Sequence, residues 1–318
     1  MSYKLGLIMD PIEGRNTRKD SRFAMLLEAQ RRGWQMYYIL MDGLRLEGET
    51  VLANAAVITV EDNPDKWFEL AATQTIELAD MDAILMRKDP PFNMEYIYAT
   101  YLLELASKRG TLIVNQADSL RDCNEKLYTA WFPQCCAPTL VSRKLEDFNR
   151  FLAEQQDIVV KPLDGMGGKS IFIVHNRDRN RNVVFETLTD HEQRFAMAQR
   201  FIPEISQGDK RVIMVDGKPV PYALARIPSE KDNRGNLAAG ASALGVPLNE
   251  RDQWICDQVG PELSRRGLLF VGLDIIGDYL TEINVTSPTC IRELDSIYGL
   301  NISCLLYTSD AADDLQPV

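Results

Sequence analysis

The sequence is poor in the residues that build zinc sites and disulfide scaffolds. It has only two histidines, His175 and His191, and its six cysteines show no Cys-x-x-Cys spacing. A zinc site would therefore have few ligands, and free thiols in a reducing compartment are expected. No apolar run reaches membrane-spanning length, and the N-terminus has the pattern of a strand rather than of a signal peptide. We therefore expect a cytoplasmic protein with no membrane partner.

Positive charge and nucleotide fingerprints are also scarce. The chain has 35 Lys and Arg residues against 46 Asp and Glu residues, which gives a net charge of −11 and a pI near 4.9. Nucleic acids and anionic membranes require clustered cations, so we expect no nucleic-acid partner, although a locally basic cleft remains compatible with this balance. No Gly-x-Gly-x-x-Gly run occurs, which leaves a dinucleotide-binding fold without support.

The overall composition is that of a soluble globular protein, with 45% hydrophobic and 25% charged residues. A chain of 318 residues is too long for one typical core and suggests two or three domains. The N-terminal third predicts an α/β domain, because a strand over 3–9, a helix over 21–32 and a strand over 34–40 form a βαβ unit with parallel strands.

A second α/β pattern follows in the same third of the chain. A strand over 83–86 is followed by a helix over 94–108 and a strand over 111–114. Arg87 and Lys88 come directly after the first of these strands, where ligands of open α/β sheets bind, and could hold a substrate carboxylate. An ordinary charged loop explains them equally well.

The middle of the chain carries a phosphate-binding pattern. The strand over 158–162 contains Lys161, and it is followed by the loop Gly165-Met166-Gly167-Gly168 and a strand over 171–174. A P-loop is rejected, because its first glycine would fall at Leu163 and the context is strand–loop–strand. Backbone N–H groups of a glycine hairpin can instead cover phosphates, with Lys161 and Lys126 as point charges. An edge-strand lysine and a loose turn are the simpler alternatives.

The next stretch adds cations and a candidate lid. A β-type segment over 197–203 precedes a hairpin that places Arg211 and Arg226 on facing strands, as candidates for anion contacts. Residues 228–245 are rich in Ser, Asn, Gly and Ala around Arg234. Such a stretch buries little and could close over a phosphate site as a lid, or be a plain connector.

The last strand pair carries a candidate metal site. After a helix over 249–266, an apolar run leads to Asp274, a Gly277-Asp278 turn, and a strand with Glu282 and Asn284. Residues two apart share a strand face, and Mg²⁺ prefers carboxylate and amide oxygens together with substrate phosphates. A regular two-residue hairpin would turn Asp274 away from Glu282, so we predict a bulge or an odd-length loop there. An acidic, solvated strand face is the alternative.

These segments resemble the bacterial, or prokaryotic-type, glutathione synthetases of the ATP-grasp superfamily. The resemblance covers roughly residues 4–303 and is carried by LMRKDPPF, SLRDCNEK, KPLDGMGG, DKRV, ARIP, RGNLAAG and the run FVGLDIIGDYLTEINVTSPTCIRE. It implies an ATP-grasp fold with a Rossmann-like N-terminal domain over 1–120, a central lid domain over 121–200 and a C-terminal catalytic domain over 201–303. It implies ATP-dependent ligation of glycine to γ-glutamylcysteine through an acyl phosphate, with ATP and Mg²⁺ (or Mn²⁺), in a homotetramer.

The resemblance also assigns roles to residues. Arg211, Arg226 and Arg234 would be catalytic, and Asp274, Glu282 and Asn284 would bind the metal. Arg87, Arg211, Arg226, Ser287 and Thr289 would bind the peptide substrate. The nucleotide would contact Lys126, Lys161, Gly165, Gly167, Gly168, Gln199, Ile202 and Asp209.

The sequence departs from the family pattern at two places. Ser242 stands where a second lid arginine is usual, and residues 304–318 replace an expected amphipathic helix with a tail that we expect to lie outside the fold. Another ATP-grasp carboxylate–amine ligase, or a nucleotide-binding homologue with impaired catalysis, therefore remains open as an alternative.

Overall fold

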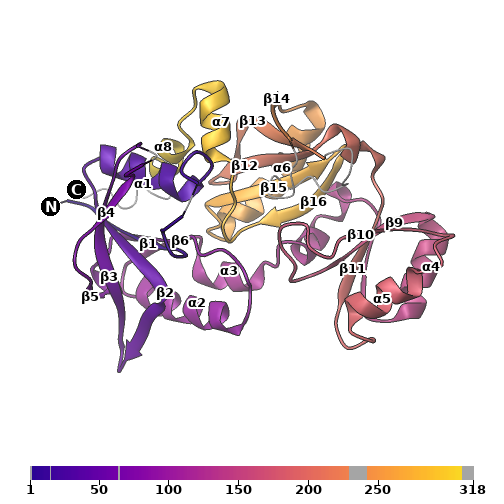
Figure 1. Cartoon of the computed structure of the whole chain (residues 1–318), viewed down its shortest axis with the longest axis horizontal. Coiled ribbons are helices and arrows are strands. Elements are labelled where there is room, and N and C mark those ends of the chain that lie inside the picture. Colours follow the sequence, from indigo (N-terminus) through magenta and orange to yellow (C-terminus); the bar gives the residue numbers. More distant parts are fainter. Residues whose placement is uncertain (1, 15, 64, 229–241, 310–318) are drawn as a thin grey trace.

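The computed structural model describes residues 2–14, 16–63, 65–228 and 242–309, which form three β-sheets with helices against them (Figure 1). The mixed α/β architecture predicted from the sequence is confirmed. No helix in these ranges is long and apolar enough to span a bilayer.

The N-terminal sheet has the strand order β4-β3-β2-β1-β6-β7, with β5 also paired to β3. The predicted βαβ unit is present, since β1 pairs with β2 and β6 in parallel and β6 pairs with β7 in parallel. Its elements are β1 (Lys4–Ile8), α1 (Ser21–Arg31), β2 (Gln35–Glu47), β3 (Thr50–Val60), β4 (Phe68–Leu70), β5 (Gln74–Glu77), η1 (Leu78–Asp80), β6 (Ala83–Met86), α2 (Met94–Ser107) and β7 (Leu112–Val114).

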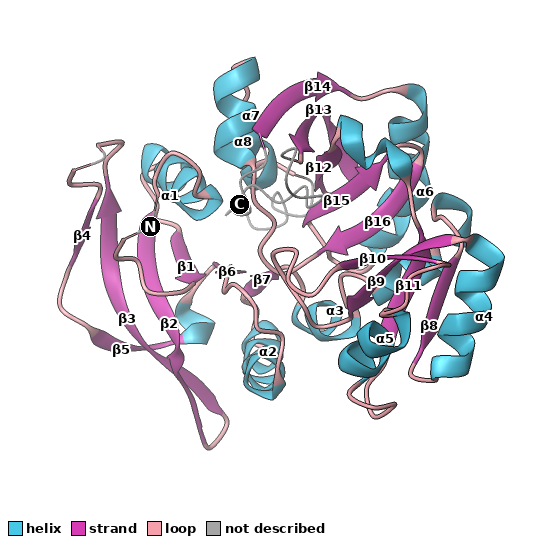
Figure 2. Ribbon diagram, turned by 45° about the vertical axis from the view of Figure 1, so that its right-hand side comes forward, coloured by secondary structure: helices cyan, strands magenta, loops and turns pink. Residues whose placement is uncertain are grey.

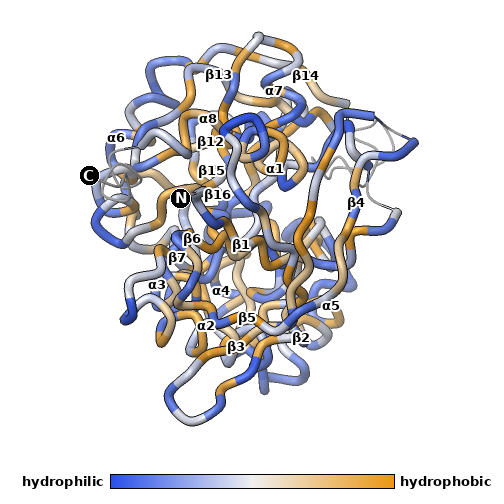
Figure 3. The backbone as a smooth tube through the Cα atoms, turned by 90° about the vertical axis from the view of Figure 1, so that its left-hand side faces the viewer, coloured by the Kyte–Doolittle hydropathy of each residue, from blue (hydrophilic) through white to orange (hydrophobic). Residues whose placement is uncertain are grey.

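Helices α1 and α2 cover opposite faces of this sheet (Figure 2). Successive side chains of a strand alternate between faces. Leu5 and Leu7 therefore pack with α1 residues such as Phe23, while Ile8 and Ile84 pack with α2 residues such as Leu103. The long β2–β3 hairpin was not predicted from the sequence. Eight of the eleven residues of β3 are apolar, and the strand is largely coloured as hydrophobic in Figure 3.

The central sheet has the order β10-β9-β11-β8, and its glycine loop lies between β9 and β10. Helices α4 and α5 cover it, and the stacked rings of Phe148 and Phe185 lie in its core. The elements between the N-terminal and C-terminal sheets are α3 (Ala117–Asp122), η2 (Leu127–Trp131), η3 (Pro133–Cys135), β8 (Thr139–Ser142), α4 (Leu145–Gln155), β9 (Asp157–Pro162), β10 (Phe172–His175), α5 (Arg181–Thr189), β11 (Ala196–Arg200) and η4 (Pro203–Gln207).

The C-terminal sheet is antiparallel, with the order β14-β13-β12-β15-β16. One face is apolar: Val212, Leu273 and Ile283 pack against Ile255 and Val259 of α6. Residues 242–247, part of which was expected to be a loop, form an edge strand. The elements are β12 (Asp209–Val215), β13 (Lys218–Ile227), β14 (Ser242–Pro247), α6 (Glu250–Arg265), β15 (Phe270–Ile276), β16 (Tyr279–Asn284), α7 (Ile291–Tyr298) and α8 (Ile302–Tyr307).

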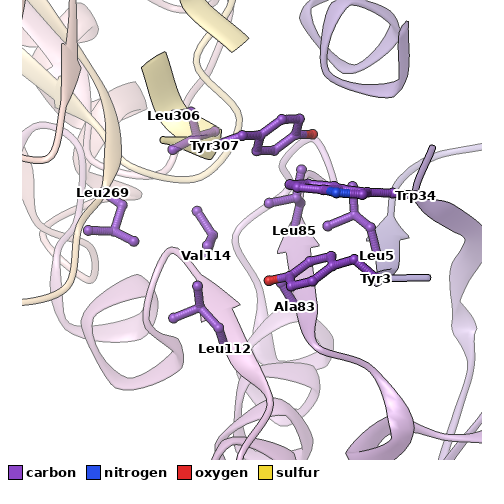
Figure 4. A pocket seen from close by; sticks show the side chains of 10 residues that line it. All are labelled: Tyr3, Leu5, Trp34, Ala83, Leu85, Leu112, Val114, Leu269, Leu306 and Tyr307. Carbon is purple, nitrogen blue, oxygen red and sulfur yellow. The ribbon is translucent and has the colours of Figure 1, made fainter. Parts of the chain in front are cut away.

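The expectation that the fold ends at Ser303 is wrong for residues 304–309. Asn301 caps helix α8 by accepting a hydrogen bond from the N–H of Cys304. Leu306 and Tyr307 are buried beneath the N-terminal sheet, and the Tyr307 hydroxyl donates to the Met25 carbonyl at 3.0 Å. The burial of Leu306 and Tyr307 is therefore sufficient to pack this segment against the N-terminal sheet. Beside it lies an apolar cavity between the sheet and α8 (Figure 4). Residues 310–318 lie outside the described part.

Candidate functional site

The polar residues of the C-terminal sheet gather on the face opposite α6. Paired residues of an antiparallel ladder point to the same side, and the ladder pairs Asp209 with Arg226, Arg211 with Asp274, and Asp274 with Glu282. Asn284 lies two residues beyond Glu282 on the same strand. The alternation of polar and apolar residues along these strands thus separates a site face from a core face. The face carries Asp209, Arg211, Arg226, Asp274, Glu282 and Asn284.

The predicted irregularity in the last hairpin is present. The turn between β15 and β16 has only two residues, Gly277 and Asp278, but the register shifts between Asp274 and Ile275. Thr281 is the extra residue of this bulge. Its hydroxyl donates to the Asp274 carbonyl at 3.0 Å, and its own carbonyl accepts from Lys161 Nζ at 3.4 Å. The bulge returns Asp274 to the side of Glu282.

Asp274 lies between two arginines. Arg211 Nε is 2.5 Å from its Oδ1, and Arg226 Nη2 is 3.0 Å from its Oδ2, which also accepts from Asn284 Nδ2 at 3.2 Å. Burial disfavours the Asp274 carboxylate, but the two guanidinium groups outweigh it and hold its pKa well below the usual range.

Asp209 is the second carboxyl group of this network. It accepts from Arg226 Nη2 at 2.5 Å through Oδ2, while its buried Oδ1 has no hydrogen-bond partner among the described residues. Burial, with the nearby Asp274 charge, raises the pKa of Asp209 in spite of Arg226. An unpartnered buried acceptor is costly, and Oδ1 therefore has capacity for a hydrogen-bond donor.

Two buried lysines from different parts of the chain converge on Glu282. Lys126 Nζ is 3.6 Å and Lys161 Nζ is 3.7 Å from Glu282 Oε1. Burial opposes the charge of Lys126, but Glu282 and Glu125 outweigh it and raise its pKa. Burial, reinforced by Lys126, lowers the pKa of Lys161 although Glu282 opposes this. The central and C-terminal sheets thus meet at one carboxylate shared by two cations.

The glycine loop lies beside these lysines. Lys126 Nζ also donates to the Gly165 carbonyl at 2.6 Å, and Asn124 Nδ2 donates to the Leu163 carbonyl at 3.0 Å. Gly167 and Gly168 have φ angles of 67° and 75°, a backbone region that favours glycine. The sequence Gly-x-Gly-Gly therefore permits a tight loop directly next to the two cations.

The remaining nucleotide candidates lie along β11. Gln199 is buried on that strand and donates to Thr139 Oγ1 at 3.1 Å, and Ile202 is buried just after the strand. Strand β11 pairs directly with β9, which carries Lys161. Gln199 and Ile202 thus belong to the same sheet as one of the two lysines.

The substrate candidates gather where β6 ends. Arg87 is buried against the Phe270 ring, its Nη2 donates to the Pro288 carbonyl at 2.5 Å, and its Nε has no hydrogen-bond partner in the described ranges. Ser287 donates to the Arg87 carbonyl at 3.3 Å, and Thr289 lies in the same loop beside Cys290. Lys88, the second cation of this loop, is paired with Asp10 at 2.7 Å.

Some candidates lie elsewhere. Arg234 falls outside the described residues. Ser242 is exposed at the start of β14 and pairs with Ile227. Its neighbour Ala243 pairs with Arg226, so strand alternation turns the Ser242 side chain to the face opposite Arg226.

Three site residues were missed from the sequence. Glu125 is an ion-pair partner of Lys126, and Asn124 ties the glycine loop. Asn115 joins the N-terminal sheet to the C-terminal sheet, because its side chain donates to the carbonyls of Phe270 and Val285 and accepts from the Phe270 N–H. The position of Asn124 and Glu125 directly before Lys126 was the one available signal.

The side-chain oxygens of this face could hold a hard divalent cation, but only if phosphate oxygens complete its coordination shell. Within the described ranges, no three His, Cys, Asp or Glu side chains form a metal-binding group. Glu282 and Asn284 nevertheless offer a carboxylate and an amide oxygen on one face, and Mg²⁺ commonly takes one or two carboxylates and completes its shell with phosphate oxygens. Asp274 fits less directly, because Oδ2 already accepts from three donors.

The comparisons with known proteins bear on this site. Residues 3–121 match the family model of the prokaryotic glutathione synthetase N-terminal domain, and residues 125–299 match that of its ATP-grasp domain. The chain belongs to the prokaryotic glutathione synthetase family. The resemblance inferred from the sequence motifs is thereby confirmed.

Relatives within the prokaryotic glutathione synthetase family are similar over nearly the full length. The chain is 56% identical to glutathione synthetase of Vibrio vulnificus strain YJ016 over 95% of both chains. It is 56% identical to that of Escherichia coli O127:H6, over 95% of this chain and 96% of the other. It is 53% identical to that of Pseudomonas aeruginosa over 98% of both.

Solved structures share the ATP-grasp fold at much lower identity. D-cycloserine synthetase DcsG superposes with a TM-score of 0.65 at 14% identity, over 98% of this chain and 100% of that chain. D-alanyl-alanine synthetase A of Vibrio cholerae gives a TM-score of 0.57 at 13% identity, over 96% and 97%. The fold class expected from the sequence is confirmed.

Proposed function

We propose that this chain catalyses the ATP-dependent ligation of glycine to γ-glutamylcysteine, giving glutathione, ADP and phosphate. The 56% identity to curated glutathione synthetases over 95% of both chains carries the proposal. The convergence of Lys126, Lys161 and Glu282 supports it, because phosphoryl transfer to an acid requires cations that bind the phosphates and a carboxylate that can hold a metal ion.

The nucleotide would lie where the two sheets meet. Lys126 and Lys161 would bind its phosphates, the loop at Gly165, Gly167 and Gly168 would cover them, and Gln199 and Ile202 would line the base. Asp209, whose Oδ1 has no partner among the described residues, would accept a nucleotide hydroxyl. Glu282 and Asn284, with Asp274, would hold Mg²⁺ or Mn²⁺. When bound, this ion would neutralise negative charge on the phosphates.

The dipeptide would lie beside it, between Arg87 and the arginine pair Arg211 and Arg226. Arg87 is a buried guanidinium with an unpartnered Nε, which suits a carboxylate. Ser287 and Thr289 flank it on the loop after β16.

The chemistry then requires orientation rather than a protein nucleophile. The cysteinyl carboxylate of the dipeptide attacks the γ-phosphorus, and ADP leaves, which produces an acyl phosphate. The glycine amine attacks the acyl carbon, and inorganic phosphate leaves with its electron pair. The cations Lys126, Lys161, Arg211 and Arg226 would stabilise the charge that develops on the transferred group, and Arg234 would add a further positive charge.

The assembly and compartment belong to the same proposal. We propose a homo-oligomer of cytoplasmic enzyme that works on small molecules. All six cysteines are free, with none paired in a disulfide, and this supports a reducing compartment.

The decisive experiment measures phosphate release from ATP and Mg²⁺ with γ-glutamylcysteine, with and without glycine, and identifies the product by mass. Glutathione formation that requires all three substrates is expected. Release with D-alanine or another amino acid pair in place of γ-glutamylcysteine and glycine would assign the chain to another ATP-grasp ligase. Nucleotide binding without any phosphate release would contradict catalysis.

A further inference from the structure

The glycine loop carries one exposed cation that the site described so far does not use. Lys169 follows Gly168 directly, shortly before strand β10, and it is exposed. It forms no ion pair within the described ranges, whereas the other charged residue of the loop, Asp164, is bound by Arg194 at 2.5 Å. The ammonium group of Lys169 is therefore available to a ligand.

The backbone of the loop brings Lys169 back towards the two buried lysines. A reverse turn is closed by a hydrogen bond from the Lys169 N–H to the Met166 carbonyl at 3.3 Å. A Cβ atom placed on Gly165 would lie 3.4 Å from the Lys169 carbonyl oxygen, so the two ends of the loop are in contact. The Gly165 carbonyl in turn accepts from Lys126 Nζ at 2.6 Å. The backbone of Lys169 thus lies beside the residue that Lys126 binds.

The loop also borders a cavity next to the candidate metal ligands. Four segments line this cavity: the glycine loop, the stretch directly before Lys126, the stretch directly after Asn284 and the loop before α2. The phosphate-binding lysine and the strand that would hold the metal ion therefore meet the glycine loop around one space. A polyanion bound by Lys126 and a metal ion on Asn284 would lie next to the loop and its exposed lysine.

The charge balance of the site gives such a lysine a role. Each of the four site cations, Lys126, Lys161, Arg211 and Arg226, lies within ion-pair distance of a carboxyl group. A triphosphate with one divalent ion keeps a net negative charge, and its binding takes this charge partly out of water, where an unbalanced charge is costly. A cation that has no carboxyl partner in the free chain can balance this charge without first giving up an ion pair.

We propose that Lys169 is a phosphate-binding residue, whose ammonium group contacts the terminal phosphates of the nucleotide when the glycine loop covers them. The inference rests on the proposed function for its ligand, a nucleoside triphosphate, and adds a cation that the loop itself supplies. Lysine suits this position, because its ammonium is a compact charge on a flexible stem that can follow the loop. A solvated lysine without a ligand is the alternative.

The first test is equilibrium binding of a non-hydrolysable ATP analogue with Mg²⁺ to the full chain, without the acid and amine substrates. Lys169→Ala is expected to weaken this binding about tenfold, the size of one charge-assisted contact. Lys169→Arg keeps the positive charge and should restore most of the affinity. Adenosine, which has no phosphates, should bind equally to all three chains.

Arg179→Ala is the matched control for net charge. Arg179 is an exposed cation of the same domain and lies just beyond the other end of β10. Its replacement changes the total charge as Lys169→Ala does, but it should leave the affinity for the ATP analogue unchanged.

Limited proteolysis reports whether the lysine itself is covered. Trypsin cleaves after lysine, and the exposed position of Lys169 makes the bond to Ser170 a cleavage site in the free chain. The ATP analogue with Mg²⁺ is expected to slow this cleavage about tenfold or more, because the loop closes over the phosphates. Cleavage after Arg179 should keep its rate. Mass spectrometry of the fragments follows both sites.

Three results would overturn the proposal: equal affinity of the parent and Lys169→Ala for the ATP analogue, an equal loss in Arg179→Ala, or unprotected cleavage after Lys169 with the analogue bound. If the parent forms glutathione while Lys169→Ala binds the analogue normally, this inference fails and the proposed function stands. A parent chain that does not bind the analogue would refute both.

Discussion

Asp274 lies directly opposite Glu282 in the ladder between β15 and β16, although only two residues separate the strands at the turn. The extra residue Thr281 makes this pairing possible, and it also connects the sheet to Lys161 through its carbonyl. One bulged residue therefore aligns the carboxylate pair and adds a hydrogen bond between the two sheets.

Replacing Glu282 tests the shared carboxylate. We expect Glu282→Gln to lower turnover about 100-fold or more, because it removes the anionic ligand that we propose for the metal ion and the counter-charge of two buried lysines. Phosphate release at saturating Mg²⁺ measures this, with Glu154→Gln on α4 as a surface control. Unchanged turnover in a folded Glu282→Gln chain would contradict the proposed role of Glu282 in metal binding.

Much of this site could be predicted from the sequence, because strand alternation is local. The two-residue spacing of Glu282 and Asn284 and the Gly-rich loop next to Lys161 are visible in the chain itself. The need for a bulge could be stated, but not that Thr281 would supply it. The engagement of Asp274 by Arg211 and Arg226 depends on the ladder between β12, β13 and β15, and no spacing along the chain reveals it.

The fold was predicted less well where the pattern was irregular. Residues 41–47 mix polar and apolar side chains, so the extension of β2 into a long hairpin with β3 was missed. Residues 304–309 have an unusual sequence, and yet Leu306 and Tyr307, five and six residues after Asn301, are buried and hold α8 against the fold. In both cases the segment is held by residues that are far away in the sequence, and the local pattern of residues does not show them.

Helix α8 should contribute measurably to stability. Tyr307 is buried against the Trp34 ring at 4.8 Å between centroids and bonds the Met25 carbonyl. We expect Tyr307→Ala to lower the free energy of unfolding by about 3 kcal/mol, and Leu305→Ala, at an exposed position of the same helix, by less than about 0.5 kcal/mol. Denaturant titration checks both values, and equal effects would mean that α8 does not dock.

Asn115 should stabilise the contact between the N-terminal sheet and the C-terminal sheet. Its side chain makes three buried hydrogen bonds of 2.7–2.8 Å to the backbone of Phe270 and Val285. Asn115→Ala leaves these backbone groups unpaired, and we expect a loss of about 2–4 kcal/mol in the free energy of unfolding. Asn182→Ala, at an exposed position of α5, serves as the control in the same denaturant titration. A loss no larger than that of the control would contradict this role.

The buried carboxylate Glu28 should make stability depend on acid pH. Hydrogen bonds from Arg31 lower its pKa to about 2, with further bonds from Asn301 and Arg32. Because the folded-state pKa lies below the unfolded value of about 4.3, this stabilisation is complete above pH 4.3 and is lost as the pH falls towards 2. Glu28→Gln should therefore be less stable than the parent by on the order of 2 kcal/mol at pH 7.

The difference between the Glu28→Gln chain and the parent should shrink between pH 4.3 and pH 2. Denaturant midpoints measured at several pH values follow it. If the difference in the free energy of unfolding stays constant over this pH window, Glu28 stabilises the fold through packing and not through its charge.

The pairing of Lys126 and Lys161 with a single glutamate has a consequence for the order of events. Four cationic side chains of the candidate site lie beside four carboxyl groups. The cations are Lys126, Lys161, Arg211 and Arg226, and the carboxyl groups are those of Glu125, Asp209, Asp274 and Glu282. Each of the four cations thus already has a carboxyl partner before a polyanion binds. If the lysines bind phosphates as proposed, we expect a divalent cation to take their place on Glu282, so that nucleotide and divalent ion enter together.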